Sequence, residues 1–110
     1  MELSTDYRTG FIRTRIAGRF DAHSVGRYLE EVAGKVDVDH ATVIIDLTGV
    51  DFMDSSALAA LVTTLKRAIE HGGDVVLAGV SAAAQIILEL TRLDEVFTIA
   101  DGGHLQDVTV

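Results

Sequence analysis

Residues 41–62 read ATVIIDLTGVDFMDSSALAALV, and this stretch decides the fold class. Residues 41–47 are almost continuously apolar and β-branched, a pattern typical of a central strand covered on both faces. A loop over residues 49–54 then leads into residues 55–71, where helical spacing predicts an amphipathic helix. The apolar stripe of this helix comprises Leu58, Leu61, Val62, Leu65 and Ile69. Gly72-Gly73 is a typical helix end.

Strands and helices alternate outward from this stretch. Residues 2–8 and 11–17 predict two strands, and the short turn at Thr9-Gly10 joins them as a hairpin. Asp21 is a good helix start before the periodic residues 22–36. The remaining predicted elements are a strand over 74–78, a helix over 82–93, a strand over 96–100 and a final helical piece around His104, Leu105 and Val108. This order predicts an α/β fold with a parallel central segment.

The length and composition predict one domain spanning residues 1–110. Hydrophobic residues make up 48%, as is ordinary for a globular protein. The chain has no cysteine, which excludes disulfides, thiolate zinc sites and thiol nucleophiles. The first residues lack the features of a signal peptide, and no apolar run approaches the length of a membrane span, so a cytoplasmic protein is expected.

The charge balance narrows the choice of partners. Nine basic and seventeen acidic residues give a net charge of -8. Nucleic acids and anionic membrane surfaces both require clustered Lys and Arg, so neither is expected as a partner. A basic protein partner and simple solubility both remain compatible with this charge.

The junction between the central strand and the long helix, residues 50–58, is the candidate functional segment. Ligand and switch sites of α/β sheets gather at such junctions, and the amides of a helix N-terminus favour an anion. A phosphate on a first-turn serine would be well placed there. The alternative is that Asp54 or Ser55 only caps the helix.

Enzyme chemistry finds little support in the sequence. Ser55 lacks the Gly-x-Ser-x-Gly pattern of a serine hydrolase, and neither a Walker loop nor a dinucleotide fingerprint occurs. The four histidines lack metal-ligand spacing. A receiver-type phosphorylation of Asp46 or Asp51 would need an acidic pair after the first strand to bind Mg²⁺, and none follows it.

Four segments together resemble the STAS family of anti-sigma factor antagonists. DFMDSSALAALV (51–62) is similar to the family signature, in which Asp-Ser-Ser/Thr-Gly-Leu opens a helix. IAGRFDA (16–22) resembles its Gly-x-Leu-Asp segment, ATVIIDLTGV (41–50) its central strand, and HGGDVVLAGV (71–80) the strand after the switch helix. The resemblance covers nearly the whole chain in order. It implies a STAS-like mixed β-sheet of four to five strands with helices packed mainly on one side.

The resemblance also implies the site residues. The serine directly after the motif's aspartate is the phosphorylated one in this family, and it corresponds to Ser55. The implied partner-binding residues are Asp21, Asp54, Ser56 and Ala57, and Asp21 is expected to lie with the others at one edge of the domain. Ala57 departs from the family's usual glycine. Because alanine is the better helix former by about 1 kcal/mol, the helix is expected to begin more firmly here.

The function implied by the resemblance is partner switching without catalysis. The unphosphorylated chain would bind an anti-sigma factor that is also a serine kinase, and so release a sigma factor. Phosphorylation of Ser55 would end this binding, and a PP2C-type phosphatase would restore it. ATP and Mg²⁺ belong to the kinase, so no cofactor is expected here. The alternative is a STAS subunit that is never phosphorylated and has a structural or regulatory role in a transporter or signalling complex.

Overall fold

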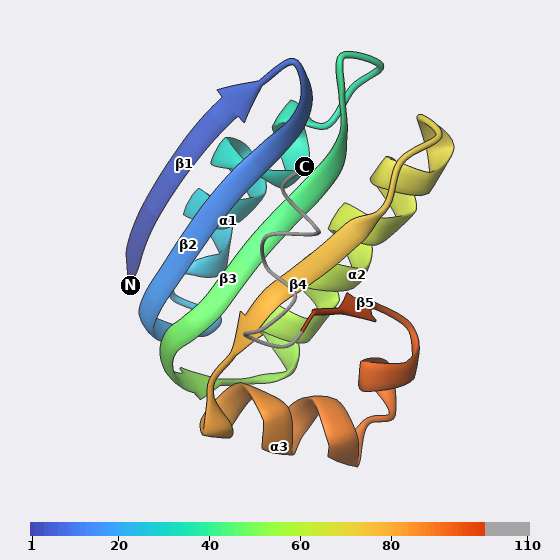
Figure 1. The fold of residues 1–110 in the computed structure, drawn as a ribbon. Coiled ribbons are helices and arrows are strands. Elements are labelled where there is room, and N and C mark those ends of the chain that lie inside the picture. The colour runs from blue at the N-terminus through green and yellow to red at the C-terminus, as the bar shows by residue number, and fades with distance from the viewer. Residues whose placement is uncertain (101–110) are drawn as a thin grey trace.

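A five-stranded mixed sheet forms the centre of the computed structural model, which describes residues 1–100. The strands lie side by side in chain order, β1 antiparallel to β2 and all later neighbours parallel (Figure 1). Their bounds are β1 (Glu2–Arg8), β2 (Gly10–Phe20), β3 (His40–Met53), β4 (Val75–Val80) and β5 (Thr98–Ile99). The helical piece predicted around His104, Leu105 and Val108 lies outside the described residues.

Two helices cover one face of this sheet, and a third crosses the end where β3 and β4 finish (Figure 1). The helices are α1 (Val25–Glu31), α2 (Ser55–Glu70) and α3 (Ala82–Leu90), with short 3-10 helices η1 (Ala33–Lys35) and η2 (Leu93–Glu95). The predicted fold class, a mixed sheet of four to five strands with helices mainly on one side, is therefore confirmed.

The opening hairpin follows from the turn chemistry. Gly10 adopts a φ of +88°, a left-handed conformation that glycine reaches without a steric penalty, and Arg8 pairs with Phe11 across the turn. Side chains then alternate along β2. Ile12 and Ile16 are fully buried beneath the helices, whereas the arginines between them face solvent on the other side.

The predicted loop over residues 49–54 is wrong for most of its length, because β3 continues to Met53. The extension is stabilised by β2, which itself continues to Phe20 and pairs with β3 as far as the Phe20–Met53 register pair. Gly49 permits the close approach: a Cβ at this position would lie 2.9 Å from the Cβ of Ala17. The strand therefore delivers the chain directly to the first turn of α2.

The predicted helix over residues 22–36 is also too long. The α-helix begins at Val25, because Asp21 and Ser24 fold the preceding residues into a separate turn, and it gives way to η1 around Gly34. Similarly, α3 ends at Leu90 rather than residue 93, and Arg92 follows it in a left-handed conformation with φ +60°. Local hydrogen bonds at these ends compete with continued helix.

Helix α2 packs on β3 through a stripe close to the predicted one. Leu61 is fully buried, but Ile69 is 61% exposed, so its predicted core position is wrong. Thr64 and Ala68 occupy the buried stripe instead. Thr64 is satisfied within the core, where its Oγ1 lies 2.7 Å from the hydroxyl of buried Tyr28 on α1. This contact fixes α1 against α2.

Candidate functional site

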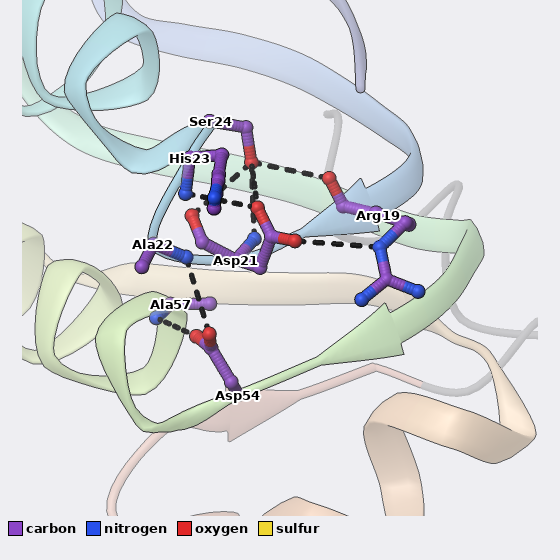
Figure 2. A network of polar contacts seen from close by, with 7 residues as sticks. All are labelled: Arg19, Asp21, Ala22, His23, Ser24, Asp54 and Ala57. Atoms are coloured by element: carbon purple, nitrogen blue, oxygen red, sulfur yellow. Dashed lines mark hydrogen bonds and ion pairs between the residues drawn. The ribbon is translucent and has the colours of Figure 1, made fainter.

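The carboxyl ends of β2 and β3 place two distant segments against each other. Because the strands are parallel, both deliver their following residues to the same edge of the sheet. The backbone N–H of Ala22 donates to Oδ2 of Asp54 over 3.1 Å, across 32 residues of sequence (Figure 2). The turn after β2 and the start of α2 therefore form one surface, which holds Asp21, Asp54, Ser55 and Ser56.

Asp54 joins these two segments with both of its carboxylate oxygens. Its Oδ1 accepts a 3.1 Å hydrogen bond from the backbone N–H of Ala57, which makes Asp54 the N-cap of α2. Its Oδ2 accepts the bond from Ala22, on the other side. The sequence predicted a partner-binding role or a capping role for Asp54, and this geometry satisfies the capping role.

Asp21 organises the turn after β2. Its Oδ1 accepts from the backbone N–H of His23 over 3.0 Å, and its Oδ2 lies 3.3 Å from Nε of Arg19 (Figure 2). The side chain is only 16% exposed. Desolvation by its surroundings favours the neutral acid, but the hydrogen bonds from His23 and Arg19 and their positive charges together lower the pKa of Asp21 below its usual value. Asp21 is therefore a carboxylate at neutral pH.

The three residues after Asp54 differ in how accessible they are. Ser55, the first residue of α2, is exposed, and Ser56 is half-buried. Ala57 is fully buried, and its methyl group belongs to the hydrophobic core. A direct partner contact by Ala57 would therefore require the first turn of α2 to open.

One pair at this edge was not assigned a role by sequence reasoning. The guanidinium of Arg19 lies 4.1 Å from the ring centroid of Phe52, and the two residues are register partners on β2 and β3. Phe52 is 38% exposed although it is a large aromatic residue. The pairing depends on the register between the extended ends of β2 and β3, for which the sequence contains no local signal.

Neither a metal site nor a membrane span is found in residues 1–100. No cluster of three potential ligands there could hold a metal ion, and none of the helices is long and apolar enough to cross a bilayer. Asp46, considered above as a phosphorylation site, accepts a hydrogen bond from the backbone N–H of Thr48 and pairs with Arg15 at 3.4 Å.

Comparison with known proteins assigns the family. A family model described as the STAS domain matches residues 3–104. The chain belongs to the STAS domain family. In sequence, this STAS domain is 25% identical over 107 residues to the anti-sigma-B factor antagonist of Staphylococcus aureus, covering 96% of this chain and 98% of the relative.

Solved structures show the same STAS fold. An anti-sigma-factor antagonist (STAS) domain protein from Planctomyces limnophilus has a TM-score of 0.83 at 23% identity, covering 98% of each chain. The anti-sigma factor antagonist SpoIIAA in its unphosphorylated form has a TM-score of 0.82 at 17% identity, covering 98% of this chain and 96% of that chain. The phosphorylated form of SpoIIAA, a cell fate determinant of Bacillus, has a TM-score of 0.77 at 16% identity, covering 99% of this chain and 100% of that chain.

Proposed function

We propose that this STAS domain is an anti-sigma factor antagonist that works by partner switching and is not an enzyme. Unphosphorylated, it binds an anti-sigma factor that is also a serine kinase, and thereby frees a sigma factor. The kinase transfers phosphate from ATP to Ser55 and the complex separates. A PP2C-type phosphatase removes the phosphate, and the cycle takes place in the cytoplasm, where ATP is available.

The observation that supports this proposal most directly is the exposed Ser55 at the first position of α2, beside the turn that holds Asp21. A kinase needs its acceptor hydroxyl accessible, and Ser55 is the most exposed of the three residues after Asp54. The relatives named as anti-sigma factor antagonists match nearly the full length of the chain, and one of them, SpoIIAA, has been described in both phosphorylation states.

The local electrostatics suit a reversible phosphate. The N-terminus of α2 favours an added anion, since its first backbone N–H groups have no partner within the helix. Asp54 already accepts from the N–H of Ala57, so the phosphate on Ser55 would lie beside a second negative group. A partner docked on this surface would meet new negative charge and bulk at once, and like charges brought together at an interface cost several kcal/mol.

A second role, an unphosphorylated STAS subunit of a transporter or signalling complex, is favoured by Ala57. Its buried methyl group fixes the first turn of α2, where the family pattern has glycine. If a kinase requires this turn to open, Ser55 would not be phosphorylated. The same surface would then bind another subunit of the complex permanently.

Phosphate mapping tests the proposal against this alternative. The full chain is incubated with ATP and, in turn, each kinase-type anti-sigma factor encoded in the source genome, and the modified residue is identified by mass spectrometry. We expect phosphate on Ser55 in the wild type and in Ser56→Ala, and none in Ser55→Ala. Phosphate on Ser56 alone would overturn the assignment of Ser55. No phosphate from kinases that are active on other substrates would favour the permanent subunit.

A further inference from the structure

Arg19 and Phe52 form a preorganised pair beside the proposed switch. The guanidinium lies over the exposed aromatic ring, 4.1 Å from its centroid, and its Nε is held 3.3 Å from Oδ2 of Asp21. Phe52 is three residues before Ser55, and its strand neighbour Arg19 is two residues before Asp21. The pair therefore lies on the same edge as both segments of the site.

The hydrogen-bonding capacity of this guanidinium is mostly unused. The Arg19 side chain is 63% exposed, and its contact with Asp21 uses Nε. Within residues 1–100, neither Nη nitrogen of Arg19 makes a hydrogen bond, and Figure 2 shows the guanidinium standing at the margin of the polar network. Beside it is an open hollow lined by Met1, Arg19, Asp21, His23 and Ser24.

We propose that Arg19, held in place by Phe52 and Asp21, selects the partner protein by binding one of its carboxylate side chains through the two Nη nitrogens. This inference rests on the proposed function and specifies its partner. A planar guanidinium binds a carboxylate through two parallel hydrogen bonds, which an ammonium group does not reproduce. Arginine and aromatic residues are also the types most enriched at the energetic centres of protein interfaces.

Because Arg19 is already held in place, it binds a partner carboxylate at a lower cost in entropy than a mobile surface arginine does. A long side chain that is ordered only on binding loses rotamer entropy at that moment, and this loss subtracts from affinity. The aromatic ring of Phe52 and the carboxylate of Asp21 already restrict Arg19 in the free chain. The contact with a partner carboxylate therefore requires little further ordering.

The surroundings favour a protein partner over a small anion. The whole chain has a net charge of -8, and the carboxylates of Asp21, Asp51 and Asp54 lie on the segments that form this edge. These negative charges would repel a small polyanion that approached Arg19. A protein surface that is mainly basic, with one acidic side chain opposite Arg19, complements the pattern. The mixed charge also rejects uniformly basic partners, which would place a cation against Arg19.

The test compares two arginines of the same strand. Arg15, like Arg19, is exposed on β2 and pairs with an aspartate, Asp46, at 3.4 Å, but it lies four residues earlier on the strand, away from the end that carries Asp21. Affinity for each kinase-type anti-sigma factor of the source genome is measured without ATP for the wild type, Arg19→Lys, Arg19→Glu and Arg15→Glu. Thermal unfolding of each variant establishes that it is folded.

We expect Arg19→Lys to weaken binding about 10-fold and Arg19→Glu by about 100-fold or more, since truncating or opposing a charge pair at an interface costs several kcal/mol and each tenfold is about 1.4 kcal/mol. Arg15→Glu should bind within about twofold of the wild type, as an exposed charge outside the interface does. Exchanging single surface acids of the partner for arginine should identify one change that restores binding of Arg19→Glu.

The outcomes separate this inference from the proposed function. If the wild type binds but Arg19→Glu and Arg15→Glu bind equally well, the role of Arg19 is overturned while partner switching stands. If Arg19→Glu binds weakly and no exchanged acid of the partner restores it, Arg19 acts only by holding the Asp21 turn, and the inference is again wrong. If no such anti-sigma factor binds the wild type, both proposals fail.

Discussion

Both carboxylate oxygens of Asp54 accept a hydrogen bond from the chain's own backbone, so this residue has a structural role besides any contact with a partner. A carboxylate beside an exposed serine is a natural contact for a basic partner. Here, however, each oxygen accepts a backbone hydrogen bond, one from Ala57 within α2 and one from Ala22 in the neighbouring turn. Asp54 therefore acts first by holding the two segments of the site together.

Replacing Asp54 should lower stability where replacing its neighbour Asp51 does not. Asp54→Ala removes an N-cap and a hydrogen bond between segments, so we expect the free energy of unfolding to fall by about 0.5–2 kcal/mol, the usual range for loss of a cap. Asp51 is exposed on β3, and Asp51→Ala should stay within about 0.5 kcal/mol of the wild type. Urea unfolding measures both. Equal stability of the two variants would show that the cap contributes nothing.

The pKa of Asp21 should respond to Arg19 and not to Arg15. We expect Arg19→Gln to raise the pKa of Asp21, because it removes a hydrogen bond and a positive charge from the carboxylate. Arg15→Gln should instead raise the pKa of Asp46, which desolvation favours as the neutral acid but Thr48 and Arg15 hold low. Carboxyl carbon shifts followed by NMR through the acid range measure both. The two ion pairs would be contradicted if Arg19→Gln changed the pKa of Asp46 and not that of Asp21, or if neither substitution changed a pKa.

The direction of the pH effect follows from the same shift. The pKa of Asp21 is lower in the folded chain than its usual value of 3.8. Such a group stabilises the fold at pH values above 3.8, and this contribution is lost as the pH falls through the lower, folded value. The contribution of Asp21 to stability is therefore fully present at neutral pH, where the partner would bind.

At the scale of elements, the burial of one leucine on α2 contrasts with the exposure of another on α3. Leu61 is fully buried between α2 and the sheet, whereas Leu90 is 80% exposed at the end of α3. Leu61→Ala should lower the free energy of unfolding by about 2–5 kcal/mol, as large-to-small core substitutions do. Leu90→Ala should change it by no more than about 0.5 kcal/mol. Thermal or denaturant unfolding measures the free energy of unfolding of both variants. A small effect of Leu61→Ala would show that Leu61 does not lie on the buried side of α2.

The elements that the sequence predicted well are those fixed by local pattern. The helix over residues 55–71 and the strand over 41–47 were found because their apolar spacing and β-branched runs arise within the elements themselves. The end of β3 was missed because it is stabilised by pairing with Phe20, over thirty residues away. Ile69 was misplaced because apolar spacing alone does not fix which side of the helix is covered, and near the end of α2 the covered side holds Thr64 and Ala68.

The site shows the same division between local and distant contacts. The capping position of Asp54 could be read from its place before a helix, and the juxtaposition of Asp21 with it was expected from the family resemblance. The bond from Ala22 to Asp54 and the stacking of Arg19 on Phe52 depend on register shifts along β2 and β3. Such shifts have no signal in a single sequence.

At the scale of the whole molecule, the strand topology gathers the residues of the proposed site at one end of the sheet. Parallel neighbours carry the ends of β2 and β3 to the same edge, which therefore holds the turn of Asp21, the pair Arg19–Phe52 and the exposed Ser55 at the start of α2. The rest of residues 1–100 packs around one hydrophobic core, which supports this edge. A modification at the edge should therefore change binding without changing the fold.

Phosphorylation of Ser55 should abolish partner binding while leaving the domain folded. A phosphoserine adds about -1.5 to -2 charges, taking the net charge from -8 to about -10. At the start of α2 this charge gains roughly 0.3–1 kcal/mol from the helix N-terminus, which offsets repulsion from Asp54. The melting temperature should therefore move by no more than about 4–8 °C, the shift that corresponds to about 1 kcal/mol in a domain of this size.

Binding should respond far more strongly than stability, since a misplaced like charge costs several kcal/mol at an interface and each 1.4 kcal/mol is about tenfold in affinity. Ser55→Ala should bind constitutively, and Ser55→Asp should weaken binding only in part, because it adds one charge and fewer acceptor oxygens than phosphate does. Calorimetric melting and affinity measurements on the same purified phosphoprotein separate the two effects. Loss of the folded state on phosphorylation would mean that the switch works by unfolding, and retained affinity would mean that Ser55 lies outside the interface.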